Sequence, residues 1–547
     1  MKEIVDNIHR LPAILFSWIA PNMRLFLGYR LPEVWVLAVL IGALVAIAAI
    51  VFRMLIALYQ LSWLGTASER TIEAALAQPW WVIIAAPTFG GLIVGWLLQT
   101  YQPKQRAGGV ADVIEARALG GRGLPVREGL MSALVTTVSL GFGASAGREG
   151  PVVHLGATIG TALCQLFSLP DSARRILLAC GVASAVSASF NAPIAGVLFA
   201  HEVILGHYAM SAFVPIVLAS TIGTVVSRLW FGEAAAFVIP DYEITSYLEI
   251  PAFALLGLTC AAVAIIFQFS LIGTDYVARN ISMPLWLRPV IGGLAIGSIG
   301  VFFPQVLGVG YEATDQALKH ELTITVMLSL LVAKTAATSI TLASRFGGGI
   351  FSPCLYLGAM TGGAFGLIAA SVYPEMASSH GLYAILGMGA VAAAVLGAPV
   401  STTVIVFELT GGYELSIALL ICVSIATGLN QAIHGKSFFH WQLGMRGVCL
   451  HEGAHAFLGT SVKVRQFMDA PPEDETDRVF DPGSGAPYLH VTDSLESALK
   501  SFDNSGASSL PVVDKGDATR IVGIARHVRA LNHFNKALIQ ATEEEHR

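Results

Sequence analysis

The chain has 547 residues, of which 54% are hydrophobic and only 13% are charged, whereas soluble domains usually carry about a quarter charged residues. Its formal net charge of −5 indicates no nucleic-acid partner. The composition therefore excludes an ordinary soluble protein over most of the length and favours a membrane protein.

Residues 1–31 precede the first long apolar run and are expected to form a cytosolic N-terminal segment. They contain Lys2, Arg10, Arg24 and Arg30, and positive charge beside a membrane span is retained in the cytoplasm. They lack an apolar run followed by a small-residue cleavage site, so no cleaved signal peptide is expected.

Residues 32–450 are a series of apolar runs, many close to the ~20 residues that a helix needs to cross hydrocarbon. The clearest runs are residues 34–51, 81–98, 209–226, 250–269 and 324–342. We therefore expect an all-α polytopic domain embedded in the lipid bilayer. Both termini are expected in the cytoplasm, which requires an even number of crossings.

Two patterns occur twice in this region, in the same order each time. P-x4-G-A-x2-G begins at Pro151 and again at Pro353, and A-P-x8-E begins at Ala192 and again at Ala398. Such duplication predicts two repeats, roughly residues 80–230 and 250–450, with the substrate site where they meet. Alternatively, glycine and proline merely punctuate apolar helices.

Each half also places a glycine-rich break before a helix start. The first break runs from Gly141 to Pro151 and the second from Phe346 to Pro353. Proline suits the first turn of a helix, and the free N–H groups there, together with the helix dipole, attract anions. Two such starts could hold a dehydrated anion without a full positive charge, which predicts an anion pathway.

Glu149 lies in the first break, and an ionisable side chain is costly within a membrane unless it has a function. Its carboxylate could occupy the place of the anion and block it, and protonation would neutralise and release it. Glu149 is therefore a candidate gate and proton carrier. It could instead only cap the helix or pair with Arg148.

Over about residues 32–449 these features resemble the CLC family of chloride channels and chloride/proton exchangers, in its bacterial form. Gly147–Pro151 looks like the GREGP motif and Gly349–Pro353 like the GxFxP motif, and Phe190–Pro193 with Glu202 looks like a third stretch of the fold. The resemblance implies a homodimer with one anion pathway per subunit in the plasma (inner) membrane. It also implies that the repeats are inverted and built from many unequal, partly re-entrant helices.

The resemblance also implies roles at the anion site. Glu149 would be the external gating glutamate. Backbone N–H groups of Arg148, Glu149 and Gly150 would line the outer site, and those of Ile350 and Phe351 would bind the central anion. Chloride or a similar anion is the expected transported ligand, no cofactor is expected, and the protein is expected not to be an enzyme.

Three positions depart from the family pattern. Residues 107–111 stand where the family has GSGIP, so Gly108, followed by Gly109, replaces a serine whose hydroxyl contacts the anion. Phe439 stands at the position of a pathway tyrosine in the last membrane helix, and Val203 at that of the inner proton glutamate.

These substitutions favour channel-like or weakly proton-coupled conduction, because Val203 cannot take up a proton. A coupled chloride/proton antiporter is the alternative. Glu202 and His201 lie nearby, and His201 could accept a proton because the pKa of histidine lies near neutral. Two positions along a helix from Val203, however, His201 would lie on a different face.

One motif favours a different class of protein. The sequence from His451 and Glu452 to His455 matches H-E-x-x-H, the zinc-protease signature. Gly453 disfavours a helix there, and no third ligand is evident nearby. A zinc-dependent membrane protease is therefore a remote alternative, and no metal site is assigned.

Residues 451–486 are expected to be a linker and a mobile loop, because residues 470–486 are rich in Pro, Asp, Glu and Gly. Residues 487–547 resemble a single CBS-type module, a small α/β cytosolic domain. Its expected strands are residues 488–491, 509–514 and 521–525, and its expected helices are residues 494–502 and 527–539. Some family members bind adenine nucleotides in such modules, although this copy shows no phosphate-binding signature.

Overall fold

The computed structural model describes residues 17, 19–20, 23, 27–28, 30–68, 70–119, 123–232, 247–372, 374, 378–410, 415–448, 462–470, 487–514 and 520–535. The chain divides into two compact units, Met1–Phe438 and Phe439–Arg547. The division falls at the start of helix α19 (Phe438–Gly444), shortly before the predicted end of the membrane domain at residue 450.

The first unit is built mainly of α-helices joined by short connections. They are α2 (Leu31–Leu64), α3 (Ile72–Leu76), α4 (Trp80–Tyr101), α5 (Val110–Leu119), α6 (Val126–Gly141), α7 (Glu149–Leu166), α8 (Asp171–Phe190), α9 (Pro193–Phe199), α10 (Met210–Phe231), α11 (Ile250–Asn280), α12 (Leu287–Phe302), α13 (Tyr311–Leu318), α14 (Ile324–Ala343), α15 (Phe351–Val372), α16 (His380–Leu396), α17 (Pro399–Thr410) and α18 (Ser416–His434). A π-helix, η1 (Ala200–Leu205), follows α9, and the 3-10 turns η2 (Tyr247–Glu249) and η3 (Pro304–Val306) precede α11 and α13.

Eight of the described helices are long and apolar enough to cross a membrane. The five apolar runs named above coincide with α2, α4, α10, α11 and α14. Large apolar side chains on these helices are exposed, for example Val36, Ile266 and Val332, and lipid tails would cover such surfaces. The predicted all-α polytopic membrane domain is confirmed.

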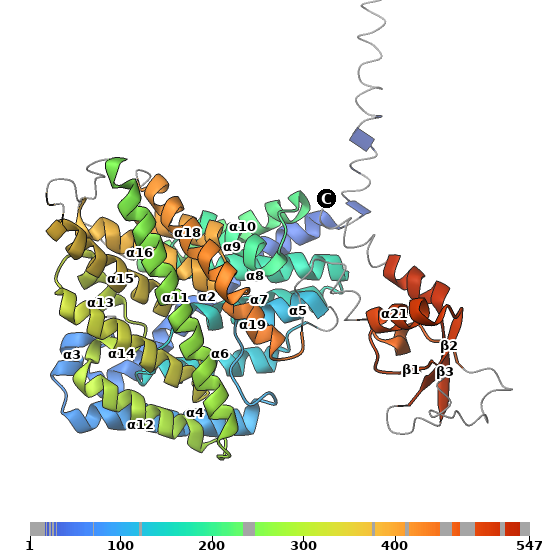
Figure 1. Ribbon diagram of the computed structural model, residues 1–547, viewed down its shortest axis with the longest axis horizontal. Helices are drawn as coiled ribbons and strands as arrows, with labels where there is room; N and C mark the ends of the chain where they lie inside the picture. Colours follow the sequence, from blue (N-terminus) through green and yellow to red (C-terminus); the bar gives the residue numbers. More distant parts are fainter. Residues whose placement is uncertain are drawn as a thin grey trace, which may run out of the picture. The chain divides into compact units, whose positions relative to one another are not determined.

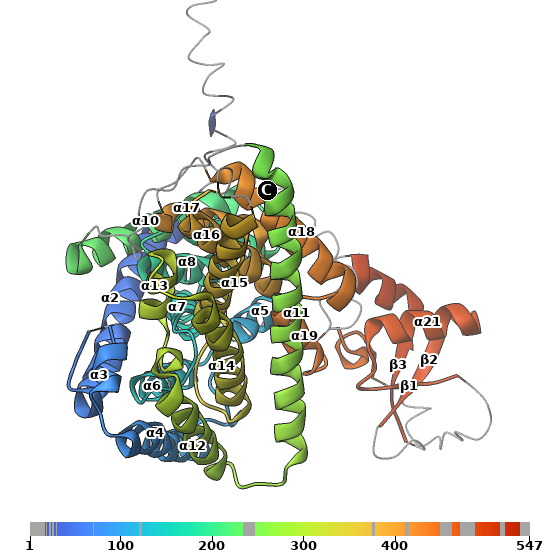
Figure 2. The ribbon, with the colours of Figure 1, turned by 60° about the vertical axis from the view of Figure 1, so that its left-hand side comes forward.

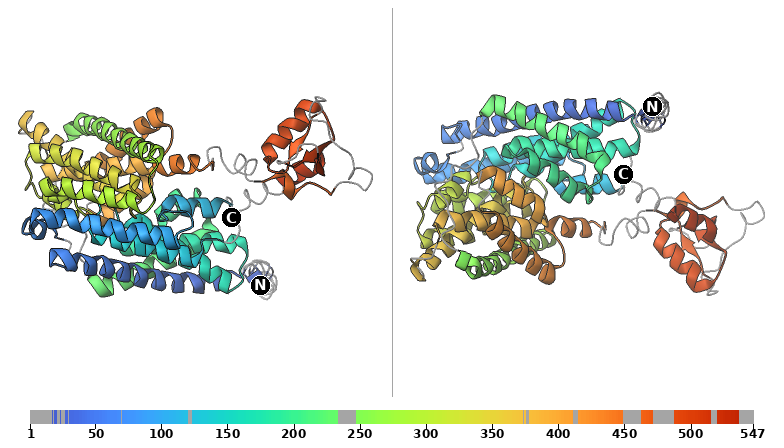
Figure 3. Two further views of the ribbon diagram at one scale, coloured as in Figure 1. Left: turned by 90° about the horizontal axis from the view of Figure 1, so that it is seen from below. Right: turned by 90° about the horizontal axis from the view of Figure 1, so that it is seen from above.

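The two halves of the first unit lie side by side. Figure 3 shows the helices of the first half, in blue and teal, next to those of the second half, in yellow and orange. In Figures 1 and 2, α4 of the first half runs alongside α12 of the second. Only glycine fits where they touch, because a Cβ on Gly91 would lie 2.2 Å from the Pro289 carbonyl oxygen, and one on Gly293 2.2 Å from that of Pro87.

The repeated glycine of the P-x4-G-A-x2-G pattern has the same role in each half. A Cβ on Gly156 of α7 would lie 2.4 Å from the Gly181 carbonyl oxygen of α8. A Cβ on Gly358 of α15 would lie 2.3 Å from the Gly387 carbonyl oxygen of α16. Small residues let helix backbones approach closely within membranes. The repeated pattern therefore reflects a repeated helix pair and is more than chance punctuation.

The second unit contains a small three-stranded sheet packed with a helix. Its elements are β1 (Leu489–His490), α21 (Leu495–Ser505), β2 (Ser509–Val513) and β3 (Ile521–Arg526). The strand order is β1-β2-β3, with β1 parallel and β3 antiparallel to β2, and residues 527–535 are helical. The Ser494 hydroxyl caps α21 by accepting the Ser497 N–H, and Phe467 and Phe502 lie in the core. These elements agree with the small α/β module predicted from the sequence.

The glutamates that end the A-P-x8-E pattern connect the two halves of the first unit. The Glu202 carboxylate accepts two backbone N–H groups at the start of α17, at 3.0 and 2.7 Å. The Glu408 carboxylate accepts two at the start of α9, also at 3.0 and 2.7 Å. Each glutamate thus caps the helix that opens the same pattern in the other half, where an anionic acceptor is favourable. The donors are Val400 and Ser401 for Glu202, and Ile194 and Ala195 for Glu408.

We expect Glu408→Ala to lower the free energy of unfolding by about 2 kcal/mol, because two N–H groups of α9 lose a charged acceptor. Glu202→Ala should have a similar effect through α17. Denaturant unfolding of the detergent-solubilised protein measures both. Glu321→Ala is the control, because Glu321 is exposed; equal stability of all three variants would contradict the capping role.

Candidate functional site

The starts of α5, α7 and α15 converge inside the first unit. Gly147 and Gly349, one from each glycine-rich break, form an isolated antiparallel bridge in which each N–H donates to the carbonyl of the other at 2.7 Å. A Cβ on Gly150 would lie 3.4 Å from the Gly349 Cα and 3.8 Å from a Val110 methyl. The two breaks therefore pair with each other, and three helix starts face a common region.

Glu149 is buried at this point and its carboxylate is held by the second half. One oxygen, Oε1, accepts hydrogen bonds from the Tyr311 hydroxyl at 2.7 Å and from the Ser352 hydroxyl at 2.6 Å. The guanidinium Nε of Arg148 lies 3.9 Å from the same oxygen. Oε2 has no hydrogen-bond partner among the described residues. The carboxylate thus lies across the start of α15.

Glycine at position 147 makes room for that carboxylate. A Cβ there would come within 2.8 Å of Oε2 of Glu149 and 3.1 Å of the Ser352 nitrogen. Any larger side chain at Gly147 would therefore displace the glutamate or the start of α15. Gly147 therefore leaves open the space that the Glu149 carboxylate occupies.

Ile350 and Phe351, the residues expected to bind the central anion, lie at the start of α15, and both are buried. The first N–H groups of a helix have no partner within the helix, so they remain available to a ligand. The Phe351 ring packs against Phe190 and Phe199, with ring centres 4.9 and 6.3 Å apart. The first turn of α15 therefore packs against aromatic rings of α8 and α9.

Gly108 and Gly109 lie just before α5, and the place of the missing serine side chain is occupied. A Cβ on Gly108 would lie 2.4 Å from Nε2 of His154, a buried residue of α7. The Gly108 N–H donates to the Ser132 hydroxyl at 2.5 Å. The sequence did not predict this contact of His154, although His154 lies three residues after Pro151 on the same helix.

Asp112 fixes the start of α5. Its carboxylate accepts the Gly109 N–H at 3.0 Å and forms a two-point contact with the Arg106 guanidinium at 2.5 and 2.7 Å. Burial acts to lower the pKa of Arg106, but the hydrogen bonds and charge of Asp112 raise this pKa above its ordinary value. Arg106 therefore stays charged and holds the segment that replaces the GSGIP motif.

The predicted inner proton position lies in the π-helix η1. Val203 is not titratable, and the Glu202 carboxylate is engaged as the cap of α17. The buried His201 ring bonds the Val197 carbonyl through Nδ1 at 2.9 Å and stacks on Tyr208. Its Nε2 has no hydrogen-bond partner among the described residues. Single π-helical turns occur often at functional sites.

Two further predictions concern residues that are not part of the first unit. Phe439 is buried at the second position of α19 and belongs to the second unit. The stretch from His451 to His455, with Glu452, lies outside the described residues. Among the residues that are described, no group of three or more His, Cys, Asp or Glu side chains could hold a metal ion.

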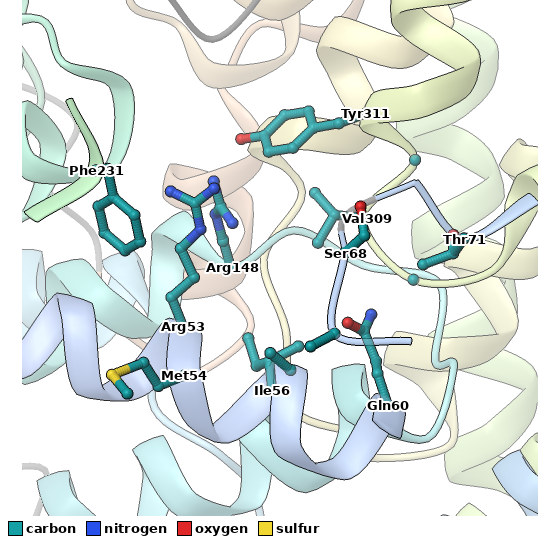
Figure 4. Close-up of a pocket in the computed structure, with 14 residues that line it drawn as sticks. Arg53, Met54, Ile56, Gln60, Ser68, Thr71, Arg148, Phe231, Val309 and Tyr311 are labelled. Atoms are coloured by element: carbon teal, nitrogen blue, oxygen red, sulfur yellow. The ribbon is translucent and has the colours of Figure 1, made fainter. Parts of the chain in front are cut away.

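Arg148 and Tyr311 also border a cavity of about 290 Å³ (Figure 4). The Arg148 guanidinium lies over the Tyr311 ring, 4.9 Å from its centre. Arg53 of α2 lines the same cavity and lies over the Phe231 ring at 4.1 Å. Two guanidinium groups therefore border this cavity, and one of them, Arg148, also lies beside the buried carboxylate of Glu149.

Comparison with known proteins identifies similar chains. The family model described as voltage gated chloride channel matches residues 90–431. A ClcB-like chloride channel protein of Ralstonia nicotianae is 32% identical over 397 residues, which is 71% of this chain and 91% of the relative. The H(+)/Cl(-) exchange transporter ClcA of Cronobacter sakazakii is 31% identical over 419 residues, which is 74% of this chain and 87% of the relative.

Among solved structures, the fold resembles that of a slow cyanobacterial Cl−/H+ antiporter. The TM-score is 0.68 and the sequence identity 22%, and the match covers 76% of this chain and 98% of the other. At this identity the likeness concerns the fold. It agrees with the many unequal helices expected from the sequence.

Proposed function

Because the chain belongs to the voltage gated chloride channel family, the CLC family that its motifs resemble, we propose that it carries chloride across a membrane through a pathway gated by Glu149. The observation that carries this proposal is the buried Glu149 carboxylate at the starts of α7 and α15, bound by Tyr311 and Ser352. An anionic side chain there stands where free helix N–H groups attract anions.

The geometry supports a simple gating cycle. While the carboxylate is ionised it acts as a tethered anion and excludes chloride. Protonation removes its charge and weakens both hydroxyl contacts, so the side chain leaves. Chloride then binds the N–H groups of Ile350 and Phe351 and, further out, those of Arg148 to Gly150. Binding by partial charges is weak enough for the ion to leave again.

We propose coupled chloride/proton exchange ahead of channel-like conduction. The sequence favoured a channel because Val203 replaces a proton acceptor. The exchanger named among the relatives, at 31% identity, supports the alternative at least as well. The unpartnered Nε2 of His201 also offers an acceptor that Val203 lacks. Channel-like conduction stays the second candidate, since a relative at 32% identity is named a chloride channel protein.

The protein would act as a transporter without enzyme activity or a cofactor, in the plasma (inner) membrane with both termini in the cytoplasm. An adenine nucleotide at the CBS-like module stays a prediction. A zinc protease built on His451 and His455 stays a remote alternative.

A second copy of the chain is the proposed partner. Large apolar side chains are exposed on α9, α17 and α18, which contact one another in the order α9, α17, α18. They are Ile194, Val400, Ile417 and Leu420. Exposed apolar side chains of a membrane protein contact either lipid tails or a partner, and we propose that a second copy covers these, as the family resemblance implies.

We expect the mass of the detergent-solubilised protein to be that of two chains, and Val400→Arg to shift it towards one. A single chain in the unaltered protein would contradict the dimer.

Paired measurement of chloride and proton flux from reconstituted liposomes tests the function. Chloride moving down its gradient should drive protons uphill. Glu149→Gln should abolish the proton movement and leave chloride flux, because the amide carries no charge. Fast chloride flux without uphill protons in the unaltered protein would favour the channel. Absence of any anion flux from folded protein would contradict transport.

Tyr311→Phe should speed chloride flux at neutral pH by roughly tenfold or more. It removes one of two hydroxyl donors to the Glu149 carboxylate, and a hydrogen bond to a charged group is worth about 1.5–3 kcal/mol. Tyr356→Phe is the matched control, since Tyr356 is buried and its hydroxyl has no hydrogen-bond partner in the described part of the chain. If both variants transport alike, the Tyr311 contact does not hold the gate.

A further inference from the structure

The cavity beside Arg148 and Tyr311 is larger than a single chloride ion requires. Its volume of about 290 Å³ lies at the lower end of the ~300–1,000 Å³ usual for small-molecule sites. Two of its lining residues, Arg148 and Tyr311, also contact Glu149. An occupant of this cavity would therefore lie next to the gate.

Two guanidinium groups face this space from different elements. Arg53 comes from the middle of α2 and Arg148 from the residue that precedes α7. Each is oriented by an aromatic ring, Phe231 at 4.1 Å and Tyr311 at 4.9 Å. None of the described residues that line the cavity is acidic. Two like charges directed at one small space favour an anion between them.

The other wall of the cavity supplies neutral polar groups. Gln60, Ser68 and Thr71 line it opposite the arginines, as Figure 4 shows. Planar guanidinium groups bind oxyanions through paired N–H donors, and hydroxyl and amide groups can bind the remaining oxygens. This set of donors on two walls fits a polyatomic anion better than a spherical one.

We propose that this cavity binds a tetrahedral oxyanion, a sulfate or phosphate group, between Arg53 and Arg148 outside the Glu149 gate. Its occupant obstructs the approach of chloride to the gate and thereby slows transport. The proposed binding depends only on the cavity, whereas the proposed inhibition also depends on the proposed function, chloride transport.

The phosphate group could come from solution or from a lipid. Met54 and Phe231, at the rim of the cavity, are exposed apolar side chains, so a lipid headgroup could also reach the site. Both sources present the same tetrahedral oxyanion to the two arginines. The experiment therefore needs a lipid-free arm and an arm with defined lipids.

Calorimetric titration of sulfate into the full-length protein in detergent tests the binding. Arg53→Gln should weaken binding at least tenfold. Arg70→Gln is the matched control, because it removes the same charge from an exposed arginine that does not line the cavity, two residues from Ser68. Binding that is absent, or weakened equally in both variants, would overturn the site, because bulk electrostatics would then explain the effect.

Flux measurements test the consequence. External sulfate should slow chloride efflux of the unaltered protein and of Arg70→Gln, while Arg53→Gln should need at least tenfold more sulfate for the same effect. If vesicles that contain phosphatidic acid, whose headgroup is a phosphate monoester, instead slow efflux compared with purely zwitterionic vesicles, and Arg53→Gln removes that difference, the lipid phosphate monoester is the occupant. Equal inhibition of all variants would overturn the regulatory role. Sulfate binding without any chloride flux would refute the proposed transport and retain the binding site.

Discussion

The structure depends on how helix starts inside the first unit satisfy their free N–H groups. The first turn of every helix carries donors without partners in the helix, and lipid offers none. Here the two halves supply partners for each other. Glu202 and Glu408 cap α17 and α9 across the repeat, and Gly147 and Gly349 pair directly. The starts of α7 and α15 are left facing one another, with the Glu149 carboxylate between them.

This division of donors distinguishes Glu149, the proposed gate, from the two capping carboxylates. Glu202 and Glu408 each accept two backbone N–H groups, so protonating either one would weaken the contact between the halves. Among the described residues, the hydrogen-bond donors to Glu149 are two side-chain hydroxyls, those of Tyr311 and Ser352. The release that the proposed gating requires would leave the backbone pairing of Gly147 and Gly349 intact. The carboxylate proposed to move is thus distinct from the two carboxylates that cap helices.

Sequence patterns predicted the parts of this arrangement that depend on local signals. Apolar runs located the long helices, because a span needs about 20 apolar residues. The duplicated glycines located the repeat, since Gly156 and Gly358 each meet a neighbouring backbone. Tyr311, His154 and the capping role of Glu202 were missed. The contacts of Tyr311 and of Glu202 join residues far apart in the chain, and the periodicity of apolar residues does not predict such contacts.

The capping role of Glu202 also limits how protons could cross. A coupled exchanger needs an acceptor on the inner side that can gain a proton without disturbing the fold. Val203 cannot gain one, and a protonated Glu202 would be a weaker acceptor for the α17 N–H groups. His201 is buried in the same π-helix, and its Nε2 has no hydrogen-bond partner among the described residues. A proton on this nitrogen would break no hydrogen bond of the helix starts, but burial of the charged ring costs free energy. Proton coupling through His201 would therefore require the surroundings of η1 to stabilise the imidazolium, whereas coupling through Glu202 would weaken the cap of α17.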